Sequence, residues 1–170
     1  MLRCVETDNL RDTRFLSLYD ISFPANEKIP PVELRRTIGH GGRMLYFFDS
    51  DVFVGFCLTY EYDGIAFVVY LAVPPHLRGE GYGSDILDHV ASERNLRGMF
   101  LTAEVTDEKA ADSRQRRDRR RFYRRNGWKP TGIVITGRVD MEVYTLDSNL
   151  QREEILLTRE RFYQALEGRY

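Results

Sequence analysis

Cysteine is scarce in this chain, whose 170 residues contain only Cys4 and Cys57. The two show no metal-ligand spacing, and neither lies in a motif for nucleophilic catalysis, so we expect no metal site and no thiol-based chemistry. Cys57 stands within the apolar run VFVGFCLTY, which indicates a small core residue in a strand. Unpaired thiols of this kind are typical of a reducing compartment.

Long hydrophobic runs are absent as well. No run approaches the roughly 20 apolar residues that a membrane-spanning helix needs. The N-terminal stretch MLRCVETDNLRD carries charge but no apolar signal segment. The net charge is −1, from 25 lysines and arginines against 26 acidic residues, so the overall charge indicates no particular partner. We therefore expect a cytoplasmic protein with no membrane partner.

The remaining composition suits one folded domain, because 42% of the residues are hydrophobic and 30% are charged. Apolar periodicity predicts alternating elements. The expected strands cover residues 2–6, 43–49, 52–62, 66–73, 99–105, 131–136 and 139–146. The expected helices cover residues 9–22, 32–38, 83–94, 109–126 and 158–166, with Asn9 and Thr158 as caps of the first and the last.

Residues 66–73 (AFVVYLAV) are apolar throughout, which predicts a central strand covered on both faces. Meander strands come first along the chain, and a strand–helix–strand–helix order follows. We therefore predict a mixed α/β (or α+β) domain.

A glycine turn follows this central strand, where residues 71–84 read LAVPPHLRGEGYGS. The prolines end the strand, and alternating glycines lead into a helix whose first N–H groups are unpaired. Such a turn forms an anion site, usually for phosphate, although the glycines could serve the turn alone. The spacing Gly-x-Gly-x-Gly matches neither a dinucleotide-binding fingerprint nor a P-loop.

A second motif, FYRRNGW at residues 122–128, lies on a later helix, with Tyr123 placed 40 residues after Gly83. A strand ending in Val-Pro, then Arg-x-x-Gly-x-Gly, then this aromatic–Tyr pair resembles the GNAT (GCN5-related N-acetyltransferase) superfamily. The resemblance extends over about residues 1–146. It implies a mostly antiparallel central sheet with a splayed parallel strand pair, flanked by helices. The last helix lies outside this common core, and we expect residues 147–170 to form a helical extension packed on the same domain.

The resemblance also implies acetyl-CoA as co-substrate, without a metal. The backbone of the central strand would pair with the pantetheine arm, and the glycine turn would hold the pyrophosphate. The residues concerned are Leu71, Ala72 and Val73 in the strand, and Arg78, Gly79, Gly81, Tyr82, Gly83 and Ser84 in the turn. Tyr123 matches the tyrosine that stabilises the departing thiolate, whereas its alternative role is packing, as we expect for Phe122.

Arginines crowd residues 114–125. On a helical wheel, Arg116, Arg119 and Arg120 share the side of Tyr123, where they could reach CoA phosphates. Many family members carry an asparagine at the position of Arg116, so either this arginine replaces it in binding pantetheine or the helix register differs. The wheel assigns Ala111, Gln115 and Phe122 to the core. The other arginines form a solvated face; a nucleic-acid partner for them is disfavoured, because no groove-reading motif accompanies them.

The general base is open to two interpretations. Glu104 lies on the strand that borders the acyl site, but it could equally pair with the arginine-rich helix. Glu27 could face the acceptor amine instead, or it could be a loop surface charge. The three histidines show no catalytic context.

The predicted function is acetyl-CoA-dependent N-acetyl transfer to a primary amine by direct attack. Two alternatives remain: a non-catalytic acyl-CoA-binding module of the same fold, and a binder of anionic partners through the arginine-rich helix. The acceptor is a small-molecule or peptide amine that the sequence does not name. Exchange of the last edge strands would give a homodimer, which the sequence leaves undecided.

Overall fold

The computed structural model describes residues 2–92, 95–146 and 149–170. Its strands are β1 (Leu2–Thr7), β2 (Gly42–Asp49), β3 (Val52–Tyr62), β4 (Ile65–Ala72), β5 (Gly98–Glu104), β6 (Trp128–Ile135) and β7 (Met141–Leu146). Its helices are α1 (Thr13–Ser22), α2 (Pro31–Thr37), the short 3-10 helix η1 (Pro75–Leu77), α3 (Tyr82–Ser92), α4 (Ser113–Arg125) and α5 (Arg152–Leu166). Positions 93–94 of the predicted third helix and 147–148 of the predicted extension lie outside the described residues.

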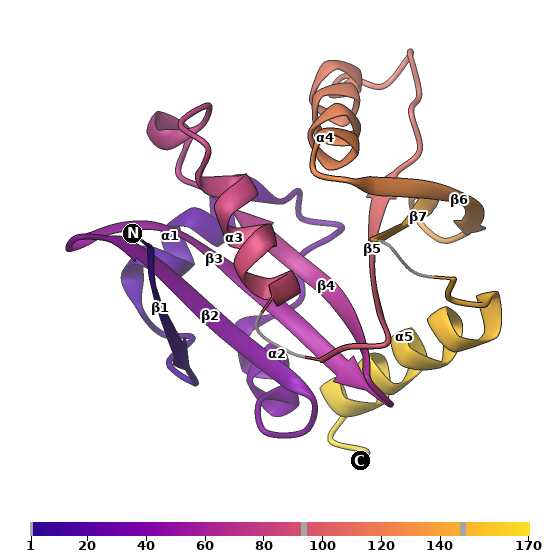
Figure 1. Cartoon of the computed structure of the whole chain (residues 1–170), viewed down its shortest axis with the longest axis horizontal. Coiled ribbons are helices and arrows are strands. Elements are labelled where there is room, and N and C mark those ends of the chain that lie inside the picture. Colours follow the sequence, from indigo (N-terminus) through magenta and orange to yellow (C-terminus); the bar gives the residue numbers. More distant parts are fainter. Residues whose placement is uncertain (1, 93–94, 147–148) are drawn as a thin grey trace.

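The strands form one seven-stranded sheet in the order β1-β2-β3-β4-β5-β7-β6 (Figure 1). Neighbouring strands are antiparallel except β4 and β5, which run parallel, so the predicted mixed and mostly antiparallel fold is confirmed. The apolar strand β4 is the fourth of the seven, as its uniform hydrophobicity predicts.

The parallel pair separates part of the way along its length. Pairing of β4 with β5 runs from Ile65 opposite Gly98 to Val68 opposite Leu101 and ends there. On the other side of β4, the register with β3 shifts between Leu58 and Thr59, so Val69 is an extra, bulged residue. A bulge bends its strand and increases the local twist. The two strands therefore diverge at their carboxyl ends, as a splayed pair.

Helices cover both faces of the sheet, and each face has its own hydrophobic core. One core packs Phe15 of α1, Leu34 of α2 and Phe162 of α5 against the sheet. The other packs Ile86 and Val90 of α3 against the opposite face, and the aromatic residues of α4 border it. In Figure 1, α3 accordingly lies in front of the sheet, whereas α1 lies behind it. Cys57 is fully buried, as its apolar context predicts.

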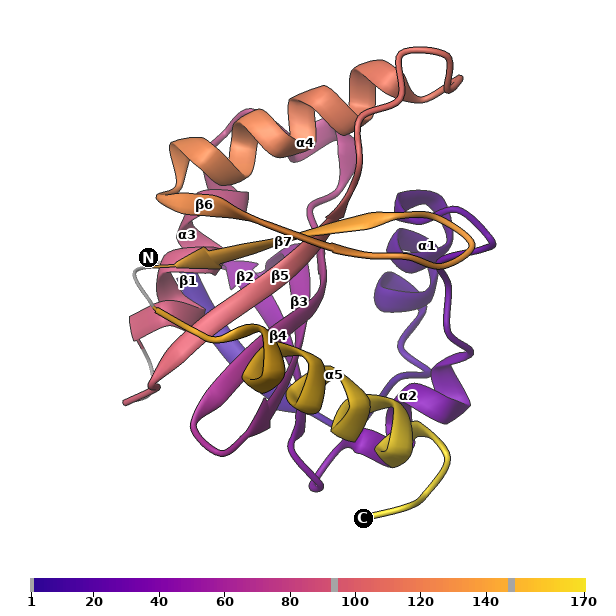
Figure 2. The same ribbon diagram turned by 90° about the vertical axis from the view of Figure 1, so that its right-hand side faces the viewer.

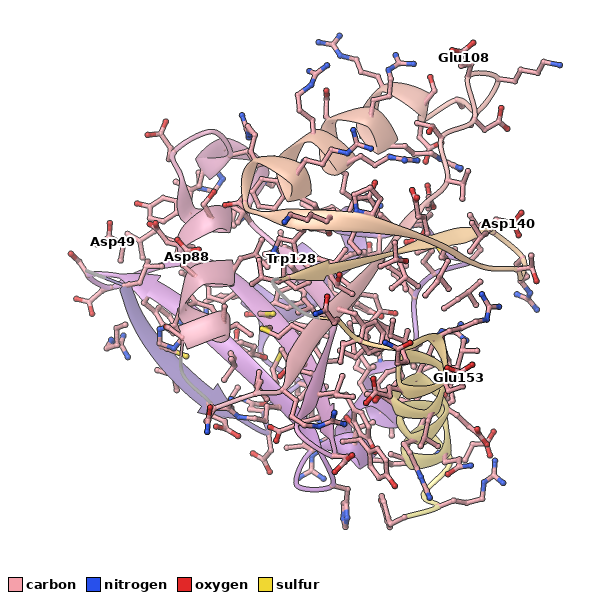
Figure 3. The ribbon with its side chains drawn as sticks, turned by 45° about the vertical axis from the view of Figure 1, so that its right-hand side comes forward. Asp49, Asp88, Glu108, Trp128, Asp140 and Glu153 are labelled. Carbon is pink, nitrogen blue, oxygen red and sulfur yellow. The ribbon has the colours of Figure 1, made fainter. Side chains whose placement is uncertain are left out.

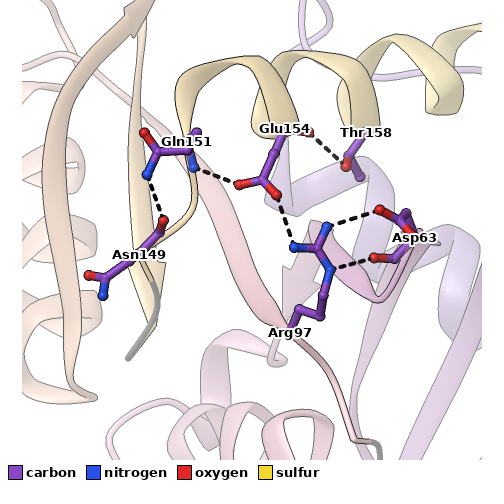
Figure 4. Close-up of polar contacts among 6 residues, drawn as sticks. All are labelled: Asp63, Arg97, Asn149, Gln151, Glu154 and Thr158. Carbon is purple, nitrogen blue, oxygen red and sulfur yellow. Dashed lines mark hydrogen bonds and ion pairs between the residues drawn. The ribbon is translucent and has the colours of Figure 1, made fainter.

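Helix α5 is fixed at both ends. Near its start, Arg97 bridges Asp63 and Glu154 with nitrogen–oxygen distances of 3.0 and 2.9 Å (Figure 4). Near its end, the guanidinium of Arg36 donates to the carbonyl oxygen of Leu166 at 3.0 Å. The helix also contacts α2, β3 and β4. These contacts fix the position of α5 on the sheet.

The prediction that Thr158 caps the last helix is wrong. The helix begins two turns earlier, where Gln151 and Glu154 form a reciprocal capping box. Thr158 is buried within the helix, and its hydroxyl donates to the carbonyl oxygen of Glu154 at 2.9 Å (Figure 4). A threonine hydroxyl can accept from a free backbone N–H as a cap, or donate to the carbonyl oxygen four residues earlier within a helix, so the residue type alone did not locate the start of the helix.

Three further expectations are corrected. Asn9 does not cap α1, because its side chain accepts from the N–H of Arg11 in a local turn, and Asp12 provides the cap. Helix α4 begins at Ser113 rather than at residue 109, and both Ala111 and Gln115 are exposed instead of joining the core. No residue of α4 is fully buried, so its charged character outweighs the weak apolar arc of the wheel.

Among the described residues, no helix has the length and hydrophobicity that crossing a membrane requires.

Candidate functional site

A cavity of about 930 Å³ opens where β4 and β5 separate. Its walls come from β4, the glycine turn, α4, the loop after α1, the tip of the β6–β7 hairpin and α5. Figure 2 shows α4 above the β6–β7 hairpin and α5 below it, with the tip of the hairpin reaching toward α1. The volume lies at the upper end of the range that small-molecule and cofactor sites occupy.

In the turn, Gly79 and Gly81 are needed for their backbone conformation, not because neighbouring atoms leave no room for a side chain. Gly79 and Gly81 have φ angles of +87° and +94°, which side chains with a Cβ rarely adopt, and nothing lies within 4 Å of a Cβ added to either. In the described part of the chain, the N–H groups of Gly81, Tyr82 and Gly83 have no hydrogen-bond acceptor. Three unpaired donors at the positive end of α3 form a ready anion site.

Two side chains brace this turn. The Nε of Arg78 donates to the carbonyl oxygen of Val73 at 3.1 Å, which ties the turn to the end of the central strand. The hydroxyl of Tyr82 donates to Asp49 at 3.0 Å, at the end of β2. Figure 3 shows Asp49 at that corner of the sheet, beside the start of α3. Arg78, Tyr82 and Ser84 all line the cavity as well.

The end of the central strand forms the adjoining wall. Leu71, Ala72 and Val73 line the cavity, together with Thr102 from β5. Because pairing of the parallel strands has already ended at Val68, the β5-facing edge of this segment has no partner strand in the described part of the chain. An open edge of backbone groups accepts an extended ligand as an added strand would be accepted.

Tyr123 projects from α4 into the same cavity. Its ring lies 5.5 Å from that of Phe122 and 6.1 Å from that of Tyr144, measured between centroids. Burial raises the pKa of the Tyr123 phenol, and the nearby Arg119 opposes that shift. The phenol is therefore protonated at neutral pH, as a proton donor must be. Phe122 also lines the cavity while it packs against the α3 core, so it combines both roles.

Glu104 forms an ion pair with Arg116 and is not part of the cavity wall. The carboxylate is 3% exposed, and its Oε2 lies 2.6 Å from Nε of Arg116, which also contacts Asp112 at 2.8 Å. Burial raises the pKa of Glu104, and the charge of Arg116 opposes the shift. Neither Glu104 nor Arg116 is among the residues that line the cavity. Of the two interpretations of Glu104, the ion pair with the arginine-rich helix is the one present in the structure.

The arginines on the tyrosine side of α4 therefore have different surroundings. Arg120 pairs with Glu142 at 2.7 Å and donates to Thr106. Arg119 lines the cavity. Of the three arginines on this side of α4, Arg119 therefore lies at the cavity. Arg116 and Arg120 instead bind the helix to β5, β7 and the preceding loop.

The loop after α1 forms the wall opposite α4, and Glu27 belongs to it. Burial raises the pKa of Tyr70, and its hydroxyl donates to the backbone oxygen of Glu27 at 2.6 Å. Tyr19 exchanges hydrogen bonds with both backbone groups of Ile29 at 2.9 Å. The loop is thus pinned by two tyrosines. The Oε1 atom of Glu27 is buried and has no hydrogen-bond partner in the described part of the chain.

Helix α5 contributes residues that the sequence analysis did not select. Arg159, Phe162 and Tyr163 all line the cavity. The Arg159 guanidinium lies over the Tyr163 ring at 4.7 Å from its centroid. An Arg–Tyr pair at i and i+4, next to the buried stripe of a helix, is the signal that could have identified them.

No group of histidine, cysteine and acidic side chains in the described residues could hold a metal ion.

Comparison with known proteins agrees with this arrangement. A putative GNAT-family acetyltransferase from Bacteroides thetaiotaomicron has a similar structure, with a TM-score of 0.74 at 22% identity over 100% of this chain and 99% of the other. A GNAT-family acetyltransferase from Elizabethkingia anophelis, solved with acetyl-CoA bound, has a TM-score of 0.61 at 13% identity over 85% and 97% of the two chains. A spermidine N-acetyltransferase chimera from Vibrio cholerae and hSSAT has a TM-score of 0.61 at 18% identity over 91% and 99%.

A comparison with curated proteins returned no significant match. The family profile described as "Acetyltransferase (GNAT) domain" matches residues 40–130, which is more than half of the chain. That region contains β2 to β5, the glycine turn and the tyrosine of α4. The chain therefore belongs to the GNAT acetyltransferase family.

Proposed function

We propose that the protein is an acetyl-CoA-dependent N-acetyltransferase that acetylates a primary amine by direct attack. The main support for this proposal is that three features line the same cavity. They are the glycine turn with its unpaired N–H groups, the backbone edge of β4 that has no partner strand, and the Tyr123 phenol. The first two suit a long ligand with an anionic pyrophosphate and an amide-containing arm, and the third suits a thiol leaving group. Structures of family members with acetyl-CoA or CoA bound support this choice of co-substrate.

The chain's own residues fit acetyl-CoA as follows. The N–H groups of Gly81, Tyr82 and Gly83 would hold the pyrophosphate, and Arg78 and Ser84 lie beside them on the cavity wall. Leu71, Ala72 and Val73 would pair with the pantetheine arm through their backbone. Arg119 supplies a positive charge on the α4 side, where the sequence analysis had also considered Arg116.

Acetyl-CoA supplies an acetyl group activated as a thioester. The acceptor nitrogen forms a bond to the thioester carbon, and the carbon–sulfur bond breaks. The proton lost by the amine passes to a base, and the leaving thiolate takes a proton from the Tyr123 phenol. A backbone N–H at the end of β4 would stabilise the developing oxyanion.

We favour Glu27 over Glu104 as the base. Glu27 lines the cavity, whereas Glu104 is in an ion pair with Arg116 and does not line the cavity. A base must come within hydrogen-bond reach of the proton it takes, directly or through one water molecule. Glu104 and Arg116 would then position α4, and with it Tyr123.

The proposal is tested by measuring thiol release from acetyl-CoA with a panel of primary amines, including amino acids, a peptide, spermidine and an aminoglycoside. Amine-dependent thiol release, with the acetylated amine identified by mass spectrometry, is the expected result. Tight binding of acetyl-CoA without turnover of any amine would favour the non-catalytic binding module instead.

A further inference from the structure

The acceptor end of the cavity has an unusual balance of charge. We define this end as the cavity-lining residues of three segments: the loop at 21–29, the hairpin tip at 135–141, and α5. The charged residues among them are one acid, Glu27, and three bases, Lys28, Arg138 and Arg159. Lys28 is offset by Asp20, whose Oδ1 lies 2.6 Å from its Nζ. Two arginines and one carboxylate therefore remain to face an acceptor.

Arg159 is the better placed of the two arginines. It is partly buried, whereas Arg138 is exposed on the hairpin tip. It lies against the Tyr163 ring, and its Nη2 donates to the Tyr163 hydroxyl at 3.3 Å. Within residues 2–92, 95–146 and 149–170, no carboxylate forms an ion pair with Arg159. A guanidinium that is oriented by an aromatic ring, and that keeps most of its donors unused, is suited to bind a planar anion.

The helix that carries Arg159 gives it a fixed position. The ion pairs of Arg97 hold the start of α5, and Arg36 holds its end. Between these points, Phe162 is buried against Tyr60 and Phe67, with ring centroids 5.6 and 5.7 Å away. Sites built on well-packed helices hold their side chains more accurately than sites on loops.

Apolar and aromatic side chains also line this end of the cavity, among them Ile21, Phe23, Ile135, Val139, Phe162 and Tyr163. A polycation would meet here a single acid and two arginines, neither of which pairs with a carboxylate of the described residues, so charge complementarity opposes acceptors such as polyamines. A molecule with an amine at one end, an acid at the other and an apolar body between them matches all three features.

We propose that the acceptor is a small amine that also carries a carboxylate, such as an amino acid, and that Arg159 binds this carboxylate while Glu27 faces the amine. This inference rests on the proposed acetyltransferase function and adds the class of its acceptor. Arg159 acts as a specificity-determining residue, and α5 is the element that brings it to the site.

The test compares matched pairs of acceptors. Free amino acids with apolar bodies, L-phenylalanine and 6-aminohexanoate among them, are assayed beside their carboxamides. The wild type should prefer the acid over the amide by roughly tenfold or more in kcat/KM, the size of one charge-assisted hydrogen bond. The carboxamide has the more readily deprotonated amine in the α-amino pair, so intrinsic reactivity works against this expectation.

Two variants and a control separate binding from folding. In Arg159→Gln the ratio of kcat/KM for the acid to kcat/KM for the amide should fall close to one, mainly through a higher KM for the acid. Arg159→Lys should restore part of the preference for the acid. The matched control is Arg152→Gln, which removes an exposed arginine of the same helix that does not line the cavity. Equal use of acid and amide by the wild type, a preference for spermidine, or an unchanged ratio in Arg159→Gln would overturn the inference.

Calorimetric titration of L-phenylalanine and its amide into CoA-saturated protein keeps the inference separate from the proposed function. Acid binding that depends on Arg159 but is accompanied by no acetyl transfer would support the acceptor class and refute the catalytic function. Acetyl transfer to amines that lack a carboxylate, without binding of the acid, would support the catalytic function and refute the acceptor class.

Discussion

Gly83 and Phe122 lie in direct contact, although one belongs to the glycine turn and the other to the aromatic motif of α4. A Cβ added to Gly83 would come within 3.0 Å of the tip of the Phe122 ring. Gly79 and Gly81 are required for their φ angles, whereas Gly83 is required for this close approach. The contact joins the proposed pyrophosphate turn to the helix that carries Tyr123.

Replacing Gly83 with alanine should therefore strain the α3–α4 contact. We expect Gly83→Ala to lower the free energy of unfolding by about 1–3 kcal/mol, as overpacking typically does. Combining it with Phe122→Leu should recover part of that loss, because the smaller side chain makes room. Urea unfolding of both single variants and of the double variant measures the coupling, and additive losses would show that the contact is not strained.

Tyr123→Phe should lower kcat by roughly a hundredfold, the smaller end of what a positioned proton donor contributes. The Kd for acetyl-CoA should change little, because only a hydroxyl is removed. Tyr144→Phe is the matched control, since this neighbouring ring is buried and is not among the residues that line the cavity. Similar kcat losses in both variants would assign Tyr123 to packing alone.

The raised pKa of Tyr123 has a consequence for the alkaline pH profile. Because burial favours the neutral phenol, the acid form persists above the ordinary tyrosine pKa of about 10. We expect kcat to show no decline assigned to this phenol until the pH exceeds about 10. A fall in kcat near pH 8 that disappears in Tyr123→Phe would contradict this expectation, because it would require a lowered pKa.

Glu27→Gln and Glu104→Gln should behave differently. Glu27→Gln removes the proposed base, so we expect kcat/KM to fall roughly a hundredfold or more and the acidic limb of the pH–rate profile to be lost. Glu104→Gln should keep that limb, even if α4 shifts and the rate falls. Glu108→Gln is a surface control, on the exposed loop before α4 where Figure 3 labels it. Loss of the acidic limb in Glu104→Gln alone would return the base role to Glu104.

Stability also tests Glu104, because burial and Arg116 act on it in opposite directions. A pKa raised on folding means that the carboxyl group favours the folded state most at low pH. Its contribution is lost as the pH rises through the folded-state value, which lies above the ordinary glutamate pKa of about 4.3. The free energy of unfolding of the wild type, measured relative to Glu104→Gln, should therefore decrease between about pH 4 and pH 7. An increase would show that the Arg116 ion pair outweighs burial.

The sequence predicted those parts of the site whose backbone conformation is determined by a residue and its immediate neighbours along the chain. Positive φ angles at Gly79 and Gly81 follow from glycine chemistry, and the left-handed Gly127 ends α4 where Asn126–Gly127 predicts it. The partner of Glu104 was left between two alternatives, because it depends on how the loop at 105–112 folds back. Arg159 was missed because only the packing of α5 against β3 and β4 brings this distant helix to the cavity.

The glycine turn is proposed to bind the pyrophosphate of acetyl-CoA, and calorimetric titration of acetyl-CoA measures this binding. The variants are Gly81→Glu and, as a control for backbone strain, Gly39→Glu, since Gly39 has a φ of +83° and open space around its Cβ position. We expect the wild type and Gly39→Glu to bind acetyl-CoA, whereas Gly81→Glu should not bind it, because its carboxylate repels the phosphates. Absence of binding by the wild type, or equal binding by Gly81→Glu, would contradict this expectation.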